Sequence, residues 1–555
     1  MLVCAISVLV AREAGAAASS PPQTPVASNA DELLNLAEKA GFKKLTDCEQ
    51  KLLEAVPIGA FAYCQSTNDE ENDPSKGDKW PEPRQIDGWL IRWLCVDDAA
   101  RKLIDPEGIQ IYGAKAIDPP DLDYISVPFR IDIEHSRILG PMSLIEANIE
   151  ALNLNGTWTG PITADRLTTR GPIFLSDSFH ADGEVRLLGA TVGGNLESEK
   201  GTFSNPKGYA LSADGIKVAG GLLLKEGFNA TGEVRLNGAA IGGPLECIGA
   251  TFTPGSWMNV ERARIAGEFW WTRISDGTKN SKPYHKNPDV WLDLTGASAA
   301  SVTDDEDSWP VPGKLFLNGF TYNHFELATD TGAAVPHDAD SRLRWLRLQD
   351  RSTGLATESY EQLATVLEKS GDERGARQVR IAMEDDLRGN LLWYRQIWPW
   401  LLKWTIGYGY EPWIALWWAL GFVIVGYLSF ALGYRAGVIG PTDKEAFRDF
   451  QAGRLSPGYQ RFNAFTYSLD TFLPIINLGL KDKWMPDAIY NPNPKALEGT
   501  WLGDFVGHRR WLNWLTRRRF FNSGRALRVY FWCHLLLGWV LITLVVAGFT
   551  GIIRR

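Results

Sequence analysis

The stretch Gly183-Glu-Val-Arg-Leu-Leu-Gly-Ala-Thr-Val-Gly-Gly-Asn-Leu-Glu197 decides the fold, because it returns 49 residues later as Gly232-Glu-Val-Arg-Leu-Asn-Gly-Ala-Ala-Ile-Gly-Gly-Pro-Leu-Glu246. Between the two copies, Val218-Ala-Gly-Gly-Leu-Leu-Leu repeats the Gly-Gly-x-Leu step. Each block therefore contains two similar units. Self-similarity at a period of about 20 to 50 residues is typical of solenoids, whose units bury their hydrophobic faces against their neighbours.

The units are short, rich in β-forming residues and free of helical periodicity, so they predict a β-solenoid, or β-helix. Short strands alternate with Gly and Pro steps from Gly108 onward, and we expect the solenoid to cover residues 108–325. Val, Ile and Leu are expected to fill its interior. The Gly-Gly steps are expected to supply the tight corners at which a coil changes direction.

Charged residues of the repeat are expected on the outer face of the solenoid, at Glu184, Arg186, Glu233 and Arg235. Stacked coils display matching side chains at regular spacing, so this stripe is a candidate binding surface. The alternative is an ordinary solvated face on which the charges of Glu and Arg balance each other.

The whole chain has 555 residues, which suggests about three or four domains, and a formal net charge of -9. This charge argues against a nucleic-acid-binding protein, because such surfaces need clustered Lys and Arg. Many of the 23 Trp follow Trp393, beside two long apolar segments. That distribution is typical of the aromatic belts of membrane proteins and predicts lipid as a partner.

The N-terminal region begins with an apolar run and continues into small, Pro-rich and Ser-rich sequence, so residues 1–28 are interpreted as a secretory signal and linker. The alternative is an uncleaved tail. Residues 29–107 predict a small helical domain. If this domain is exported, Cys48 can pair with Cys64 in a disulfide, since disulfides persist in oxidising compartments. Otherwise these two residues and Cys95 are buried thiols.

Helical segments follow the predicted solenoid. Residues 345–390 predict a helical hairpin, or neck, that packs on the last coil or makes a dimer contact. Residues 391–411 are rich in Trp and Leu but contain charges and a proline, which predicts an interfacial helix and a turn. Residues 412–434 and 529–553 are long and apolar enough to be transmembrane helices.

Basic residues set the expected orientation of these two helices. They gather in the connecting loop, residues 435–528, and above all between residues 509 and 528. The positive-inside rule places this loop in the cytoplasm and the solenoid outside it. The predicted secretory signal favours the same two-pass topology.

Two segments have the sequence features of ion channels. Thr405-Ile-Gly-Tyr-Gly reproduces the string of a potassium filter, but it precedes the first span and is interpreted as a Gly-rich turn. The apolar segment 464–480 lies between the spans, with Ser468, Asp470 and Thr471 as candidate pore residues. It is either an interfacial or oligomer-packing helix or a pore-like element, since a re-entrant segment is tolerated when it is buried in protein.

Motifs of catalytic and cofactor sites are absent from the sequence. It contains no nucleotide-binding Gly-rich motif, no His-Glu-x-x-His, no Gly-x-Ser-x-Gly, no haem-attachment motif and no Cys-x-x-Cys pair. The histidines also lack metal-ligand spacing. We therefore predict no catalytic residue, no cofactor and no metal, and an enzyme is the less favoured class.

Further motifs follow the repeated unit: Leu317-Asn-Gly-Phe-Thr-Tyr, Tyr360-Glu-Gln-Leu-Ala, Gly371-Asp-Glu-Arg-Gly-Ala-Arg, Thr405-Ile-Gly-Tyr-Gly-Tyr and Tyr467-Ser-Leu-Asp-Thr-Phe-Leu-Pro. Together with the repeat, they resemble a group of bacterial membrane proteins in which a Gly-rich repeat domain precedes two C-terminal spans. The resemblance implies this architecture and a membrane location. Some members are labelled "membrane-associated oxidoreductase", so the resemblance also implies, by label alone, a redox activity.

These observations favour a protein of the bacterial inner membrane whose β-solenoid lies in the periplasm or outside the cell. We predict that the solenoid is a binding or scaffolding module for an envelope protein or polymer. The first alternative is a channel-like or sensor protein that forms homo-oligomers through residues 465–480. The second is a membrane-associated oxidoreductase.

Overall fold

The computed structural model describes residues 26–278, 287–329, 331–352, 354–389, 392–473, 476–486 and 524–550. The predicted signal, apart from its last three residues, and the arginines from 509 to 519 lie outside the described residues. The chain divides into two compact units, Met1–Gln362 and Leu363–Arg555.

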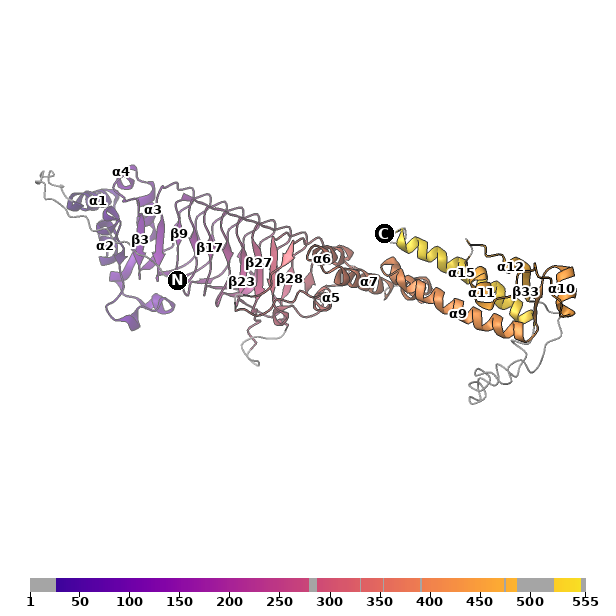
Figure 1. Ribbon diagram of the computed structural model, residues 1–555. Coiled ribbons are helices and arrows are strands. Elements are labelled where there is room, and N and C mark those ends of the chain that lie inside the picture. Colours follow the sequence, from indigo (N-terminus) through magenta and orange to yellow (C-terminus); the bar gives the residue numbers. More distant parts are fainter. Residues whose placement is uncertain are drawn as a thin grey trace, which may run out of the picture. The chain divides into compact units, whose positions relative to one another are not determined.

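The first unit is a β-solenoid of about nine turns within the described residues, which confirms the predicted fold class (Figure 1). Its strands pair in parallel between successive coils, as in the register Ile173, Leu196, Leu222. Alternate residues along each strand point inward, so the apolar residues of every coil meet in one dry interior.

The described strands of the first unit form three sheets. Sheet A runs in the order β1 (Ala62–Tyr63), β3 (Ile109–Tyr112), β5 (Ile131–Glu134), β9 (Leu152–Asn153), β13 (Ile173–Phe174), β17 (Leu196–Glu197), β20 (Leu222–Leu223), β23 (Leu245–Ile248), β27 (Glu268–Thr272), β29 (Ser301–Asp304) and β31 (His324–Phe325). Sheet C runs in the order β26 (Arg264–Ile265), β22 (Ala240–Ile241), β19 (Lys217–Val218), β16 (Thr191–Val192), β12 (Thr168–Thr169) and β8 (Asn148–Ile149).

Sheet B covers two neighbouring walls, because the long strands β18 and β21 continue from one wall to the next. Its main order is β2 (Gln85–Asp87), β4 (Lys115–Asp118), β6 (Arg137–Ile138), β10 (Trp158–Thr159), β14 (His180–Asp182), β18 (Thr202–Ser212), β21 (Asn229–Arg235), β25 (Trp257–Asn259), β28 (Trp291–Asp293) and β30 (Leu315–Phe316). Four short strands pair beside this order: β7 (Met142–Ser143), β11 (Ile162–Thr163), β15 (Val185–Arg186) and β24 (Thr251–Phe252).

An aromatic column runs through the interior of the solenoid. It consists of Phe179, Phe203, Phe228, Phe252 and Trp271, whose successive ring centroids are 5.5, 5.2, 6.1 and 5.6 Å apart. All five side chains are fully buried. Tilted and offset contacts at these distances add about 0.5–1.5 kcal/mol per pair beyond simple burial, so the column stabilises the stacking of one coil on the next.

Glycine is needed at the Gly-Gly corners of the coils because of close packing between backbones, not because of a left-handed backbone conformation. The Gly-Gly steps do not have positive φ; positive φ falls at other corner residues, such as Arg166 (φ 55°), Gly238 (φ 66°) and Arg262 (φ 56°). A Cβ atom on Gly242 would lie 2.3 Å from the carbonyl oxygen of Ala219 in the preceding coil. The Gly-Gly steps lie at the bends between the strands of sheet C and sheet A, where a coil changes direction as expected, and glycine is required there by the close approach of successive backbones.

The N-terminal end of the solenoid is covered by helices. These are α1 (Val26–Ala40), α2 (Asp47–Ala55), η1 (Val56–Ile58), η2 (Asp69–Glu71), η3 (Pro74–Lys79), η4 (Glu82–Arg84), α3 (Gly88–Val96) and α4 (Asp98–Arg101). The same segment contributes β1 and β2, which pair with β3 and β4. Residues 29–107, predicted as a helical domain, thus also provide the first strands of sheets A and B, because an open sheet edge needs a partner.

The other end of the solenoid is covered by α5 (Ala339–Leu346), which follows β31 and was not predicted. The short η5 (Glu306–Ser308) lies between β29 and β30. Arg342 of α5 is fully buried and donates two hydrogen bonds, of 2.8 and 2.6 Å, to Asp304. The next helix, α6 (Thr357–Lys369), donates from Ser359 to the carbonyl oxygen of Leu317 at 2.9 Å. The beginning of α6 therefore packs on the last coil.

The second unit contains α7 (Glu373–Gly389), α8 (Ile397–Ile406), η6 (Gly407–Gly409), α9 (Trp413–Arg435), β32 (Ile439–Pro441), α10 (Lys444–Gln451), α11 (Ala464–Phe472), α12 (Leu480–Lys483), β33 (Trp484–Pro486) and α15 (Gly524–Phe549). The helices α9 and α15 are long and apolar enough to cross a membrane. The Gly-Tyr-Gly string forms η6, the predicted turn between α8 and α9.

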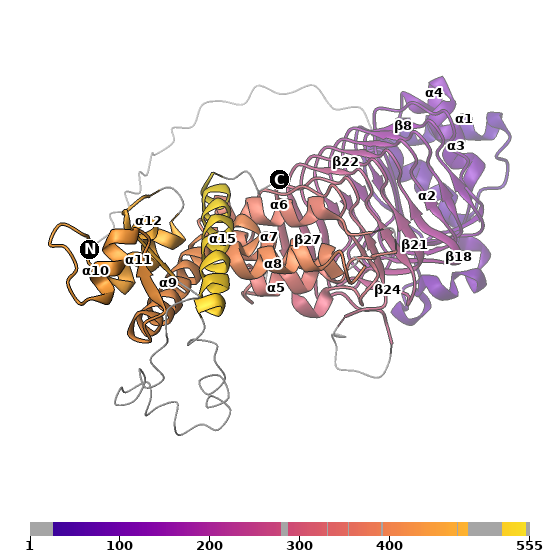
Figure 2. The same cartoon turned by 90° about the vertical axis from the view of Figure 1, so that its right-hand side faces the viewer.

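Helix α11 packs against both α9 and α15 (Figure 2). Small residues allow this approach: a Cβ atom on Gly538 of α15 would lie 2.0 Å from the carbonyl oxygen of Phe472, and one on Gly426 of α9 would lie 2.2 Å from Ser468 Oγ. Gly at helix contacts is typical of bundles in lipid, where close backbone packing replaces the hydrophobic effect. Helix α15 begins five residues before the predicted span, because Arg525 and Arg528 continue the helix beyond its apolar part.

Candidate functional site

The four residues of the predicted stripe lie on one outer wall of the solenoid, here named the ladder wall. It is formed by outward-facing residues of β15, β18, β21, β25, β28 and β30 and the residues beside them: Glu184, Arg186, Ser212, Glu233, Arg235, Trp257, Asn259, Trp291, Asp293 and Phe316. Arg186 and Arg235 are not direct neighbours, because Ser212 of the intervening coil lies between them in register.

Each arginine of the stripe pairs with an aspartate of the preceding coil. Arg186 donates from Nε to Asp165 at 2.9 Å, and Arg235 forms an ion pair with Asp214. Within the described residues, the carboxylates of Glu184 and Glu233 form no hydrogen bond or ion pair, although each residue lies two positions before one of these arginines. The wall therefore presents a carboxylate without a protein partner on alternate coils.

Aromatic side chains extend the ladder wall, and sequence reasoning missed them. Trp257 and Trp291 are nearly parallel, with ring centroids 4.7 Å apart, and Phe316 lies 5.7 and 5.9 Å from them. The Lys314 ammonium group lies 5.0 Å from the Trp291 ring. The sequence shows only that each of these aromatic residues stands next to an inward-facing residue. Trp257 and Trp291 are farther apart in the sequence than the usual length of a coil, so their shared register was not visible.

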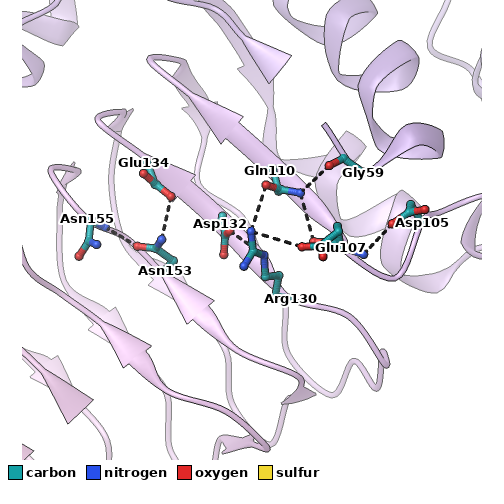
Figure 3. Close-up of polar contacts among 9 residues, drawn as sticks. All are labelled: Gly59, Asp105, Glu107, Gln110, Arg130, Asp132, Glu134, Asn153 and Asn155. Carbon is teal, nitrogen blue, oxygen red and sulfur yellow. Dashed lines mark hydrogen bonds and ion pairs between the residues drawn. The ribbon is translucent and has the colours of Figure 1, made fainter. Parts of the chain in front are cut away.

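A second polar group lies on the outer face of sheet A, close to the N-terminal helices (Figure 3). Gln110, Asp132 and Asn153 occupy matching positions on β3, β5 and β9. Arg130 lies beside Asp132, with 3.0 Å between Nε and Oδ2, and donates to Gln110 at 3.1 Å. Asn153 donates to Glu134 at 2.7 Å. These contacts connect three successive coils.

Asp132 has the most perturbed carboxyl group of this cluster. Its side chain is only 2% exposed, and burial raises its pKa to about 7, although the nearby Arg130 cation opposes the rise. A carboxyl group of this kind can exchange a proton near neutral pH. Its burial leaves no access for a substrate, so we interpret the cluster as a structural link. Sequence reasoning missed it because Asp132 lies within an apparently ordinary apolar strand.

The candidate pore residues of the inter-span segment take part in internal packing. Asp470 is fully buried and accepts backbone hydrogen bonds from Leu478, Leu480 and Lys481 at 2.7 to 2.8 Å. Thr471 donates to the carbonyl oxygen of Tyr467, one helical turn before it. Asp470 thus closes the loop between α11 and α12.

Ser468 makes the polar contact between α11 and the two long apolar helices. Its hydroxyl donates to the carbonyl oxygen of Val423 in α9 at 2.8 Å and lies 3.3 Å from His534 Nε2 in α15. All of these groups are buried within the bundle. The contact holds the three helices together.

Cysteine pairing links the N-terminal elements. Cys48 of α2 and Cys64, just after β1, form a disulfide with Cα atoms 5.0 Å apart. Cys95 remains a buried thiol, and burial raises its pKa to about 12, so it is a weak nucleophile.

Metal-binding geometry is absent from the part of the chain that the structure describes, where no three His, Cys, Asp or Glu residues are grouped to hold an ion. Comparisons with protein-family models, curated proteins and solved structures find no match to the chain.

Proposed function

We propose that this protein is a two-pass protein of a bacterial inner membrane whose solenoid lies outside the cytoplasm and binds an extended envelope polymer or protein. The observation that carries the proposal is the ladder wall, on which a glutamate and an arginine recur on alternate coils and three aromatic rings follow on the next coils. Rigid solenoids commonly bind elongated partners along such faces. The resemblance to bacterial membrane proteins with a Gly-rich repeat domain supports the proposed location.

Two features support the proposed orientation. Arg435 ends α9, and Arg525 and Arg528 begin α15, so basic residues gather at the ends that the connecting loop joins. Such residues favour the cytoplasmic side. The Cys48–Cys64 disulfide supports an oxidising compartment for the N-terminal end of the solenoid.

Exposed tryptophans support membrane contact by the second unit. They gather on and beside α8 and at the start of α9: Trp393, Trp398, Trp400, Trp404, Trp413 and Trp417. Tryptophan prefers the headgroup level of a bilayer, where its ring is buried and its N–H remains hydrated. On this proposal, α8 is the interfacial helix that supports the first span.

The ladder wall is suited to a partner that carries both hydrogen-bonding groups and apolar surface. Glu184 and Glu233 offer acceptors on one half of the wall, and Trp257, Trp291 and Phe316 offer apolar surface on the other. Neighbouring coils in a β-sheet are about 4.8 Å apart. A polymer with a short repeat can therefore contact several coils in the same way.

Site-specific photo-crosslinking tests this proposal. A photoreactive residue at Glu233 on the ladder wall is compared, in native membranes, with one at Ala240, an exposed position of sheet C in the same coil. We expect an adduct with an envelope polymer or protein at position 233 and none at position 240. Equal labelling at both positions, or none at Glu233 while the solenoid is folded, would reject a binding role for this wall.

A channel-like or sensor function is the second candidate, because the inter-span helix α11 packs against both long apolar helices, which is the layout of a pore module with a re-entrant segment. Planar-bilayer recording of the purified full chain tests it, and a silent bilayer would reject the channel. The redox activity implied by the resemblance predicts a bound chromophore if flavin or haem is used. Absence of visible absorption by protein purified from native membranes would reject both of these cofactors.

A further inference from the structure

The part of the ladder wall that carries the tryptophans extends from β21 to β30. We name it the aromatic end of the wall, and it consists of Glu233, Trp257, Asn259, Trp291, Asp293 and Phe316. Asn259, Asp293 and Phe316 match in register, and so do Trp257 and Trp291. Glu233 lies one coil before Trp257. All six side chains are half-buried, so each of them reaches solvent in part.

The two tryptophan rings of this end cover each other's faces. Their planes differ by 8°, and the 4.7 Å between their centroids is close to the spacing of about 4.8 Å between neighbouring strands. On the following coil, the Lys314 ammonium group lies 5.0 Å from the Trp291 ring. The rings are therefore stacked along the solenoid, and their edges, which carry the C–H and N–H groups, are left for a partner.

Three donor groups at the aromatic end have no acceptor among the described residues. They are the indole N–H groups of Trp257 and Trp291 and the side-chain NH2 group of Asn259, and none of them is buried. The side-chain oxygen of Asn259 already accepts from the backbone N–H of Glu261 at 3.0 Å. The NH2 group is therefore the part of this amide that stays available.

Two carboxylates lie beside these donors. Glu233 forms no hydrogen bond or ion pair within the described residues. Asp293 accepts from the backbone N–H of Thr295 at 2.8 Å, but it forms no ion pair in the part of the chain that the structure describes. The nearby cations of Arg235 and Lys314 are paired with other aspartates. The aromatic end thus combines free donors with carboxylates that have no cation of their own.

This combination selects the chemistry of the partner. A carboxylate only accepts hydrogen bonds and an indole N–H only donates one, whereas a hydroxyl group does both. A carboxylate that a partner covers must receive hydrogen bonds, because a buried charge without them is costly. An acidic polymer is repelled by the two carboxylates. A neutral polymer with many hydroxyl groups satisfies the donors and the acceptors alike.

We propose that the aromatic end of the ladder wall binds a neutral glycan. Sugar hydroxyls donate to Glu233 and Asp293 and accept from the Asn259 amide and the two indole N–H groups. The C–H groups of the sugar rings contact Phe316 and the indole edges. Several coils take part, so successive sugars of one chain are bound together. This inference rests on the binding role proposed above for the wall and names the chemical class of the partner.

Titration calorimetry of the full chain tests the inference, in a detergent without a sugar headgroup. The probes are three neutral hexasaccharides, namely cellohexaose, maltohexaose and the N-acetylglucosamine hexamer, and the acidic hexamer of galacturonate. At least one neutral probe is expected to bind, and the acidic probe is expected not to bind. Failure of all three neutral probes to bind the folded chain would overturn the inference, and so would equally tight binding of the acidic probe.

Two variants locate the binding. Asp293→Asn replaces the free acceptor by a donor and is expected to weaken binding about tenfold, because hydrogen bonds to charged groups contribute more than neutral ones. Trp291→Phe keeps a ring but removes the N–H, and it is expected to weaken binding about threefold. Unchanged binding by both variants would place the glycan elsewhere and overturn the inference.

Matched controls change the same residue types on other walls. Trp270→Phe alters a half-buried tryptophan on the outer face of sheet A, and Asp182→Asn alters an exposed acid at the end of β14. Both variants are expected to bind the neutral probe like the wild type. A loss of binding by these controls as large as that of the two wall variants would contradict a site at the aromatic end.

Photo-crosslinking separates a failure of this inference from a failure of the proposed function. A photoreactive residue at Asn318, an exposed position two residues after Phe316, leaves every group of the aromatic end in place. In native membranes, a glycan adduct is expected at this position. A protein adduct, together with no binding of any neutral probe, would overturn the glycan inference while the binding role of the wall would stand.

Discussion

Single residues at the corners of the solenoid show two different requirements for glycine. Gly238 has φ +66° and open space around its missing Cβ, whereas Gly242 faces the backbone of the preceding coil. Arg166 and Arg262 occupy corner positions with a similarly positive φ. The chain thus accepts side chains where the only cost is conformational, but not where two backbones meet.

Alanine substitutions separate these two requirements. Gly238→Ala is expected to cost about 1–2 kcal/mol, the penalty of a Cβ in the left-handed region. Gly242→Ala is expected to cost about 3 kcal/mol or more, because the coils must move apart to relieve the contact. Thermal unfolding midpoints of the full chain in detergent measure both changes. A smaller loss for Gly242→Ala than for Gly238→Ala would contradict the close-approach explanation.

Asp132 predicts a pH dependence of stability. Its pKa is about 7 in the folded protein, against a usual value of 3.8, so the folded state binds this proton more tightly than the unfolded state. Its favourable contribution to stability is therefore complete below pH 3.8 and is lost as the pH rises to about 7. Asp132→Asn stays neutral and avoids this loss.

Unfolding midpoints at pH 5 and pH 8 measure the effect. We expect the unfolding midpoint of Asp132→Asn, measured relative to that of the wild type, to be several degrees higher at pH 8 than at pH 5. Asp98→Asn, which changes an exposed acid in the same unit, is the control and is expected to show no such gain. If the unfolding midpoints of Asp132→Asn and the wild type differed by the same amount at pH 5 and pH 8, the Asp132 carboxyl group would not titrate in this range.

At the scale of elements, α5 closes the C-terminal end of the solenoid. Repeat proteins need terminal caps, because the last coil would otherwise expose its interior. The Arg342 side chain extends from α5 toward the last coil and donates two hydrogen bonds to Asp304. Its guanidinium carbon lies 3.6 Å from the Phe325 ring centroid. Trp309 also donates to Asp304 at 2.8 Å. One buried ion pair therefore connects the cap, η5 and β29.

Loss of this ion pair is expected to open the end of the solenoid. Arg342→Ala leaves Asp304 buried without its cation and is expected to cost about 3–5 kcal/mol. Arg344→Ala, on the same helix, removes an exposed pair with Glu306 and is expected to cost about 0–1 kcal/mol. Limited proteolysis between residues 326 and 350 measures both variants. Equal protection of the two variants would contradict a capping role for α5.

At the scale of the whole molecule, the proposed topology places the two units in different surroundings. A phosphatase that is active only outside the cytoplasm is expected to be inactive when fused at Ser456, in the connecting loop. The same enzyme is expected to be active when inserted at Gly371, in the turn between α6 and α7. The opposite pattern would show that the orientation is inverted.

The sequence by itself determined the solenoid, the two apolar helices and the neck, because each depends on a local period. A repeated unit, a long run without charges and a helical spacing are visible in a single line of sequence. The same reasoning placed Glu184, Arg186, Glu233 and Arg235 on an outer face, since residues alternate along a strand.

Only the tertiary structure decided which residues meet. The pairing of Arg186 with Asp165, the stacking of Trp257 on Trp291 and the burial of Asp132 all depend on the register between coils. That register varies with the length of each coil, and the sequence period does not specify it. Asp470 likewise closes the loop between α11 and α12 only because the chain brings Leu480 back to it. Contacts between distant residues are set by packing, which a local pattern does not record.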